Sequence, residues 1–194
     1  LEKIKKKKAH IGIIGLGYVG LPLAIEFCKT GFQVTGLDID KEKIDLLSRG
    51  KSYINHISGA NIKHLNQECK FKGTTNFTLI SNLDCILICV PTPLSKNREP
   101  DMSYIIATAQ KISPHLVKNQ LIVLESTTFP GTTQEVLIPA LESGSELKAN
   151  KDFFIAYSPE REDPNNKEYF IATTPKVIGA DNPKSLELAN AIYS

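Results

Sequence analysis

A short apolar run, residues 11–14, leads directly into the segment Gly15-Leu16-Gly17-Tyr18-Val19-Gly20. A GxGxxG pattern between a strand and a helix is typical of dinucleotide-binding folds, because each glycine meets a separate need. Gly15 permits a tight turn, Gly17 lets a diphosphate approach the backbone, and Gly20 lets the next helix sit close to the sheet. The anion would rest on the helix N-terminus, where free N–H groups and the helix dipole attract it. The pattern therefore predicts an α/β fold built around a phosphate site.

A second apolar run, residues 32–37, ends at Asp38, at about the 20-residue spacing expected for an acid that binds a ribose. A carboxylate accepts hydrogen bonds from both ribose hydroxyls but repels a 2′-phosphate, so the sequence predicts NAD rather than NADP. Alternatively, Asp38 only caps a helix that begins near Lys41. Lys43 could flank the adenine or meet a phosphate, or it could lie on the exposed side of that helix.

Size and charge limit the class of protein. With 194 residues, 41% of them hydrophobic, the chain is long enough for one well-buried domain. A net charge of +2 gives no electrostatic reason to expect a nucleic acid as partner. No apolar run approaches the roughly 20 residues that span a bilayer, and no cleavable leader precedes the fold, so we expect a cytoplasmic protein without membrane partners. Residues 1–9, rich in lysine, are predicted to form a disordered basic arm before a domain at 10–194.

The four cysteines, Cys28, Cys69, Cys85 and Cys89, show no CxxC pairing. Cys85 and Cys89 fall within one expected strand, where a rise of about 3.3 Å per residue would place them about 13 Å apart. That separation is too large for one disulfide or one metal ion, and the histidines show no ligand spacing either. The sequence therefore predicts buried reduced thiols and no metal site.

Hydrophobic periodicity predicts alternating strands and helices along the chain. Strands are expected at 10–14, 32–37, 70–74, 83–90, 121–124, 153–157 and 176–178. Helices are expected at about 18–30, 40–48, 60–68, 102–113 and 132–141, and from 183 onward. This order predicts a Rossmann-like, doubly wound α/β fold, with a mainly parallel sheet and helices on both faces. Because the chain begins with Leu1 and its last residues still have helical character, we expect it to be part of a longer protein.

Ligands of open parallel sheets bind beyond the carboxyl ends of the strands. The segments that follow the expected strands include Pro91-Thr92-Pro93, Ser126-Thr127 and Pro159-Glu160-Arg161-Glu162-Asp163. Alone, the prolines could form a rigid loop that ends a strand, and the hydroxyls could cap a helix. Together with the glycine motif they predict one continuous cofactor trough. Its predicted cofactor-binding residues are Gly15, Gly17, Tyr18, Val19, Gly20, Asp38, Lys43, Val90, Pro91, Thr92, Ser126 and Thr127.

Taken together, these segments resemble those of the nucleotide-sugar 6-dehydrogenases, which include the UDP-glucose and GDP-mannose dehydrogenases. The resemblance covers nearly the whole chain and is carried, in order, by Gly15-Leu16-Gly17-Tyr18-Val19-Gly20-Leu21-Pro22, Val90-Pro91-Thr92-Pro93, Glu125-Ser126-Thr127-Thr128 and Ser158-Pro159-Glu160-Arg161. The segment 159–164 looks most like the branch that oxidises UDP-N-acetylglucosamine or UDP-N-acetylgalactosamine. UDP-glucose enzymes usually have a second glutamate where Pro164 stands, and the UDP-N-acetylmannosamine branch usually has apolar residues after the arginine. A UDP-glucose or UDP-N-acetylmannosamine 6-dehydrogenase is the alternative.

The resemblance implies a four-electron oxidation of a sugar CH₂OH group to a carboxylate with two NAD, through a thiohemiacetal and a thioester on a cysteine. That cysteine and an oxyanion-stabilising lysine belong to motifs that this chain does not contain, so the chain alone is expected to bind NAD without completing catalysis. Thr127 and Glu160 match catalytic positions that hold a water and the nicotinamide side of the site, where Glu160 would activate the water or relay a proton. Glu160, Arg161, Glu162 and Asp163 would face the substrate. The resemblance also implies a homo-oligomeric full-length enzyme of surface polysaccharide synthesis.

Two other classes of protein are compatible with parts of the pattern. A non-catalytic, NAD-responsive binding module that controls a partner would need no nucleophile. An S-adenosylmethionine methyltransferase shares a glycine-rich first loop and a ribose-binding acid, but it explains neither the Ser126-Thr127 pair nor the cluster around Glu160.

Overall fold

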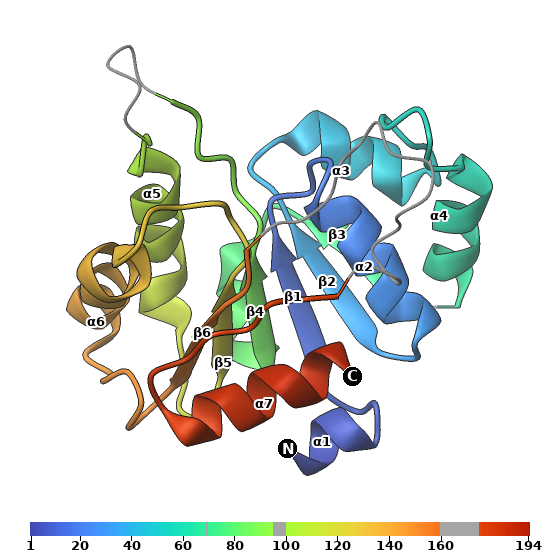
Figure 1. The fold of residues 1–194 in the computed structure, drawn as a ribbon. Helices are drawn as coiled ribbons and strands as arrows, with labels where there is room; N and C mark the ends of the chain where they lie inside the picture. Colours follow the sequence, from blue (N-terminus) through green and yellow to red (C-terminus); the bar gives the residue numbers. More distant parts are fainter. Residues whose placement is uncertain (69, 95–99, 160–174) are drawn as a thin grey trace.

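The computed structural model describes residues 1–68, 70–94, 100–159 and 175–194. Within them lies a six-stranded sheet in the order β3-β2-β1-β4-β5-β6, with every neighbouring pair parallel (Figure 1). Its strands are β1 (His10–Ile14), β2 (Gln33–Leu37), β3 (Phe71–Thr74), β4 (Cys85–Ile88), β5 (Leu121–Leu124) and β6 (Phe154–Tyr157). The order reverses between β1 and β4, as in Rossmann folds, and this confirms the predicted fold class.

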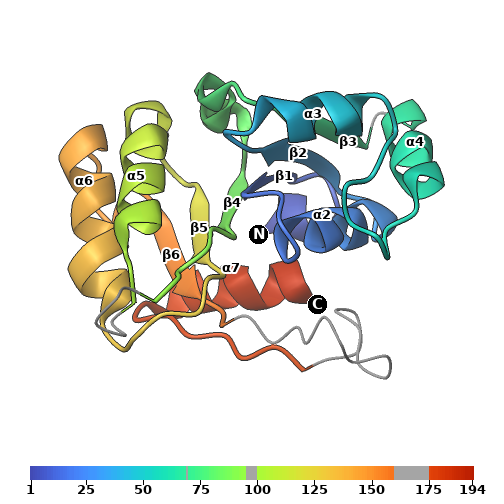
Figure 2. The ribbon, with the colours of Figure 1, turned by 90° about the horizontal axis from the view of Figure 1, so that it is seen from above.

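Helices cover both faces of the sheet. In Figure 2, α5 (Ser103–Ile112) and α6 (Ile138–Ser145) lie on one face, and α2 (Gly20–Lys29) and α7 (Pro183–Tyr193) lie on the other. Near the β3 edge are α3 (Lys41–Ser48) and α4 (Gly59–Gln67), both in contact with β3. The remaining helical segments are α1 (Glu2–Lys5), the 3₁₀ turns η1 (Phe77–Asn82) and η2 (Ser113–His115), and the π-helical turn η3 (Thr133–Leu137).

The sheet divides the core into two apolar clusters, because successive side chains of a strand point to opposite faces. Leu87 and Val123 belong to the cluster under α2 and α7, whereas Ile86 and Ile122 belong to the cluster under α5 and α6. Every residue of β4 and of β5 is buried. Their continuous apolar runs are therefore explained by helices on both sides, which is why the sequence predicted these strands well.

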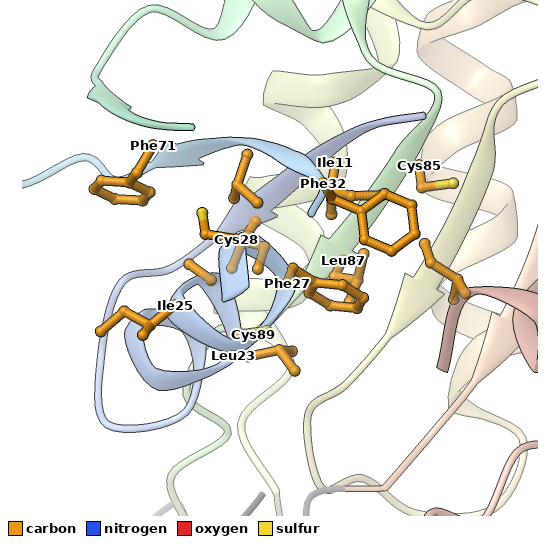
Figure 3. Close-up of a cluster of buried hydrophobic side chains, with 14 of the residues drawn as sticks. Ile11, Leu23, Ile25, Phe27, Cys28, Phe32, Phe71, Cys85, Leu87 and Cys89 are labelled. Atoms are coloured by element: carbon orange, nitrogen blue, oxygen red, sulfur yellow. The ribbon is translucent and has the colours of Figure 1, made fainter. Parts of the chain in front are cut away.

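Cys28, Cys85 and Cys89 are buried thiols, as predicted, and all belong to the cluster beneath α2 (Figure 3). Cys69 lies outside the described residues. Within the described ranges, no group of three or more His, Cys, Asp and Glu side chains is placed to hold a metal ion. In the same part of the chain, no helix has both the length and the apolar character needed to cross a membrane.

The basic N-terminal segment differs from the predicted disordered arm. Residues Glu2–Lys5 form α1, Ile4 is buried in the cluster under α7, and Lys3 Nζ lies 2.6 Å from Asp84 Oδ1. α1 also contacts α7 along the chain's lower edge in Figure 1. The lysine-rich segment also contains apolar residues that pack on the domain, Ile4 inside the cluster and Leu1 against it.

Three expected elements also differ from the structure. The strand expected at 176–178 is wrong. Only Gly179 pairs there, as an isolated antiparallel bridge with Tyr157, and the side chain of Val177 is exposed. The strand expected at 83–90 is reduced to β4, although Cys89 N still donates to Ile14 O at 2.8 Å. The helix expected at 132–141 is divided between η3 and α6. The other predicted elements lie within a few residues of their expected bounds.

Candidate dinucleotide-binding site

The glycine loop, residues 15–20, connects β1 to α2 through two positions that exclude a side chain. Gly15 has a φ of +88°, and a Cβ atom there would lie 2.6 Å from Cys89 O. A Cβ atom on Gly20 would lie 1.9 Å from Gly15 O, so only glycine allows α2 to begin this close to the strand. The loop is thus folded tightly against the carboxyl ends of β1 and β4.

Gly17, by contrast, faces open space. A Cβ atom built on it would meet no atom within 4 Å. The neighbouring Tyr18 is exposed, Val19 is half-buried, and the first turn of α2 contains no acidic side chain that would occupy its positive end. A bare backbone beside a helix N-terminus provides the space and the partial positive charge that a diphosphate requires.

Asp38 follows β2 directly and turns its carboxylate toward the glycine loop. Asp38 Oδ2 accepts from Leu16 N at 2.8 Å, and Oδ1 accepts from Asp40 N at 3.0 Å. The side chain is 7% exposed, yet a carboxylate offers about four lone-pair sites, so acceptor capacity remains for ribose hydroxyls. The cap of α3 belongs to Asp40, which accepts from Glu42 N and Lys43 N. The alternative that Asp38 is this helix cap is therefore wrong.

Lys43 lies beside Asp38 rather than pointing fully into solvent. Its Nζ is 3.7 Å from Asp38 Oδ2 and 5.8 Å from the ring centre of Tyr53. The Tyr53 hydroxyl donates to Leu16 O, and burial together with Asp38 and Asp40 raises the pKa of this phenol, so it remains a donor. Sequence reasoning missed Tyr53, because it comes from an irregular polar stretch that carries no motif.

The ends of β4 and β5 are joined by hydroxyl groups. Ser126 is buried and its Oγ donates to Val90 O at 2.6 Å, and Thr92 Oγ1 donates to Thr127 O at 2.5 Å. Thr127 itself is exposed at this edge, as is Pro91. The next helical turn, η3, has no side-chain cap, so the helix-cap interpretation of Ser126 and Thr127 is wrong. The structure thus places these predicted residues along the same edge of the sheet as the glycine loop.

A buried polar cluster that sequence reasoning missed lies behind this edge. Glu125 follows β5 and is fully buried; its Oε2 lies 2.5 Å from Lys176 Nζ, and its Oε1 accepts from the Tyr193 hydroxyl. Lys176 Nζ is also 3.3 Å from Ser158 Oγ. Glu125 and Ser158 stand in segments that carry the family resemblance, but nothing in the sequence linked them to Lys176 or Tyr193. The predicted substrate residues Glu160, Arg161, Glu162 and Asp163 lie outside the described residues.

A pocket of about 410 Å³ is lined by residues 128–134, by residues 155–157 of β6 and by residues 179–181. Neither the glycine loop nor Asp38 lines it. Its lining begins at Thr128, the neighbour of the predicted Thr127, so the pocket lies toward the β6 end of the sheet edge.

These residues fit a dinucleotide in outline. Open space above Gly17 suits the diphosphate, and the buried Asp38 carboxylate suits the adenosine ribose on the β2 side. The remaining half would extend over β4 and β5, where Ser126 and Thr92 lie. The sheet order and this edge define a Rossmann-type dinucleotide-binding domain.

The comparisons with known proteins specify the family. The model of the UDP-glucose/GDP-mannose dehydrogenase family, NAD binding domain, matches residues 9–194. The chain belongs to this family and is its NAD-binding domain, which confirms NAD as the cofactor and removes the methyltransferase alternative.

Individual relatives agree with this assignment. The UDP-N-acetyl-D-glucosamine 6-dehydrogenase of Pseudomonas aeruginosa is 35% identical over 187 residues, or 96% of this chain and 43% of the relative. The UDP-N-acetyl-D-mannosamine dehydrogenase of Salmonella typhi is 35% identical over 189 residues, or 94% of this chain and 44% of the relative. A crystal structure of a GDP-mannose dehydrogenase ternary complex from Pseudomonas aeruginosa matches with a TM-score of 0.86 at 35% identity, covering 94% of this chain and 43% of that chain. The chain thus spans less than half the length of these relatives.

Proposed function

We propose that this chain is the NAD-binding part of a UDP-N-acetylhexosamine 6-dehydrogenase, which oxidises the C6 hydroxymethyl group of the sugar to a carboxylate. The observation that carries the proposal is the glycine loop, open above Gly17 and flanked by the buried Asp38, in a chain of this family. The relatives named for UDP-N-acetyl sugars support the substrate class. By the resemblance, the segment Glu162-Asp163-Pro164 favours UDP-N-acetylglucosamine or UDP-N-acetylgalactosamine as substrate over UDP-glucose and UDP-N-acetylmannosamine.

In this proposal the described residues bind and orient the cofactor, which accepts a hydride from the sugar carbon when bound. Gly17 and the N-terminus of α2 hold the diphosphate, and Asp38 holds the adenosine ribose and disfavours a 2′-phosphate. Lys43 balances the Asp38 charge from 3.7 Å. The other half of the cofactor is bordered by the exposed Pro91 and Thr127 and by residues that they adjoin: Val90, Thr92 and Ser126.

The chemical roles rest on position in the sequence. We assign Thr127 to hold a water at the carboxyl end of β5, and Glu160 to activate that water or relay a proton. Glu160, Arg161, Glu162 and Asp163 would contact the substrate. Hydride transfer to two NAD removes four electrons, and the water supplies the second oxygen of the carboxylate.

Two of the described thiols, those of Cys28 and Cys85, are poor nucleophiles. Burial raises the pKa of Cys28 and of Cys85 to about 12 in each case, so both remain protonated and inaccessible near neutral pH. The resemblance places the catalytic cysteine in a motif that this chain does not contain. The same family resemblance supports the proposal of a homo-oligomeric enzyme, and a cytoplasmic location stays an expectation from the sequence.

The cofactor part of the proposal is tested by titration calorimetry of the purified chain. NAD is expected to bind, and NADP to bind at least about tenfold more weakly, a difference of about 1.4 kcal/mol. Equal affinity for the two cofactors would remove the role given to Asp38.

The reaction is tested by joining this chain to the C-terminal part of the UDP-N-acetyl-D-glucosamine 6-dehydrogenase of Pseudomonas aeruginosa. NADH absorbance is then followed with different UDP sugars. UDP-N-acetylglucosamine or UDP-N-acetylgalactosamine should yield about two NADH per sugar, the stoichiometry of a carboxylate product. The unjoined chain serves as the control and should yield none. Turnover only with UDP-glucose or UDP-N-acetylmannosamine would replace the substrate assignment, and an inactive but NAD-binding joined protein would favour the binding-module class.

A further inference from the structure

The buried cluster behind the β5 edge joins parts of the chain that lie far apart in sequence. Glu125 contacts Lys176 across 51 positions and Tyr193 across 68 positions. Lys176 also reaches Ser158 Oγ and lies 4.9 Å from the ring centre of Tyr193. The Glu125 carboxylate is therefore the point where several elements meet: the ends of β5 and β6, the segment before Val177 and the last turn of α7.

Stability alone is a weak reason for such an arrangement. The Glu125 side chain is fully buried and that of Lys176 is 21% exposed, so both charges lose most of their hydration. A buried ion pair is often no more stabilising than well-packed apolar side chains of similar volume. A cluster of this kind instead fixes one geometry, because any displacement leaves a buried charge without its partner.

The geometry that the cluster fixes is that of the β5 edge. Glu125 N donates to Ile88 O at 2.9 Å, and the next residue, Ser126, donates its hydroxyl to Val90 O. Ser158 N donates to Leu124 O at 3.0 Å, which ties the end of β6 to the same point. Anchoring the Glu125 carboxylate from behind thus fixes the start of the turn that carries Ser126 and Thr127.

We propose that Glu125, Lys176 and Tyr193 are positioning residues that hold the Ser126–Thr127 turn in place for the nicotinamide half of the cofactor. With the diphosphate over the glycine loop and the adenosine over β2, the other half of a dinucleotide lies over β4 and β5. The cluster therefore acts on one half of NAD only. This inference rests on the NAD site of the proposed function.

Tyr193 completes the arrangement as a hydrogen-bond donor. Burial and the neighbouring Glu125 carboxylate raise the pKa of its phenol well above the usual value, so the group stays protonated and donates to Glu125. Its ring also packs 6.1 Å from that of Phe27 on α2. The cluster is thereby linked to the helix whose N-terminus faces the diphosphate.

The test compares the affinities of the chain for NAD and for ADP-ribose, which lacks the nicotinamide ring. The double variant Glu125→Gln/Lys176→Met removes both charges together, so no buried charge is left unpaired. We expect about a tenfold loss of NAD affinity with ADP-ribose affinity unchanged within about twofold. Tyr193→Phe keeps both charges and should give a smaller loss, about threefold, again for NAD only. Lys184→Met, which removes the cation of an exposed ion pair on α7, is the matched control and should change neither affinity.

The outcomes separate this inference from the proposed function. Selective loss of NAD affinity in the double variant or in Tyr193→Phe supports the positioning role. Unchanged NAD affinity, or an equal loss for both ligands, overturns it, because a general loosening of the fold would weaken both. If the double variant does not fold, Tyr193→Phe decides alone by the same criterion. A wild-type chain that binds neither ligand would overturn the proposed function and this inference with it.

Discussion

The two halves of the cofactor edge are built in different ways. On the β1–β2 side, the shape comes from the backbone: Gly15 and Gly20 allow no side chain, Gly17 faces open space, and one carboxylate borders it. On the β4–β5 side, the shape comes from side chains, through the hydroxyls of Thr92 and Ser126 and the ion pair behind them.

The two halves of the site therefore depend on the sequence in different ways. The half built from backbone comes mainly from one short segment, the glycine loop. Its shape should change little unless a glycine gains a Cβ atom. A half built from side chains depends on partners that are distant in sequence, and single substitutions there should alter its ligand contacts without disturbing the other half. NAD and ADP-ribose, which lacks the nicotinamide ring, are therefore the natural pair of probes for the site.

The largest effect is expected from Gly17→Val. Its Cβ atom would meet no protein atom within 4 Å, so the melting temperature should hold while the side chain fills the space of the diphosphate. Affinity for both NAD and ADP-ribose should fall about 100-fold or more in calorimetry. Gly179→Val is the matched control, since a Cβ atom there also meets nothing, and it should bind normally. Retained affinity in Gly17→Val would mean that the diphosphate lies elsewhere.

The next effect is expected from Asp38→Asn. Hydrogen bonds to charged groups contribute about 1.5–3 kcal/mol, so affinity for NAD and ADP-ribose should fall roughly tenfold to a hundredfold together. Discrimination against NADP should weaken, because the repelling charge is gone. Asp40→Asn is the control, since asparagine caps α3 as well as aspartate does, and it should leave binding unchanged. A loss confined to NAD, with ADP-ribose unaffected, would contradict the assignment of the adenosine to β2.

A smaller and more selective effect is expected from Ser126→Ala. The variant loses the hydrogen bond to Val90 O, worth about 0.5–1.5 kcal/mol, so NAD affinity should fall severalfold while ADP-ribose affinity does not change. Ser143→Ala removes a comparable hydroxyl on the exposed surface of α6 and provides the control. Equal weakening of both ligands would show that the halves are not independent.

The buried thiols should make the free energy of unfolding depend on pH. We expect no change near neutral pH and a gradual loss of stability at alkaline pH. Burial raises the pKa of Cys28 from 9.0 to about 12, and that of Cys85 likewise, so the folded state favours the protonated thiol. This contribution is fully present below pH 9.0 and is lost as the pH rises toward about 12. Urea unfolding across this range should show a falling free energy of unfolding, with a shallower slope in Cys28→Ala and in Cys85→Ala. Identical slopes would mean that the thiols are solvated in the folded protein.

The same distinction explains what could be predicted from sequence. The fold was predictable because β4 and β5 are buried on both faces and therefore continuously apolar, and because the glycine motif marks the first crossover. Asp38 was predictable from its spacing to that motif. The strand expected at 176–178 did not form, because only Gly179 pairs with Tyr157 there and Val177 is exposed.

The contacts of the cluster around Glu125 were not predictable, because Lys176 and Tyr193 stand in no motif and reach Glu125 only through the folding of the whole sheet. Tyr53 was missed for a related reason, because its contact with Leu16 O joins an irregular segment to the glycine loop. Glu160, Arg161, Glu162 and Asp163 remain predictions from the resemblance.

The short helix α1 has a practical consequence for handling this protein. Its charged sequence invites removal or replacement by an affinity tag, yet Ile4 and the Lys3–Asp84 pair fasten it to the underside of the domain next to α7. Trimming it would uncover apolar surface on the helix that delivers Tyr193 to the interior. A purification tag is therefore better separated from Leu1 by a flexible spacer than substituted for the first residues.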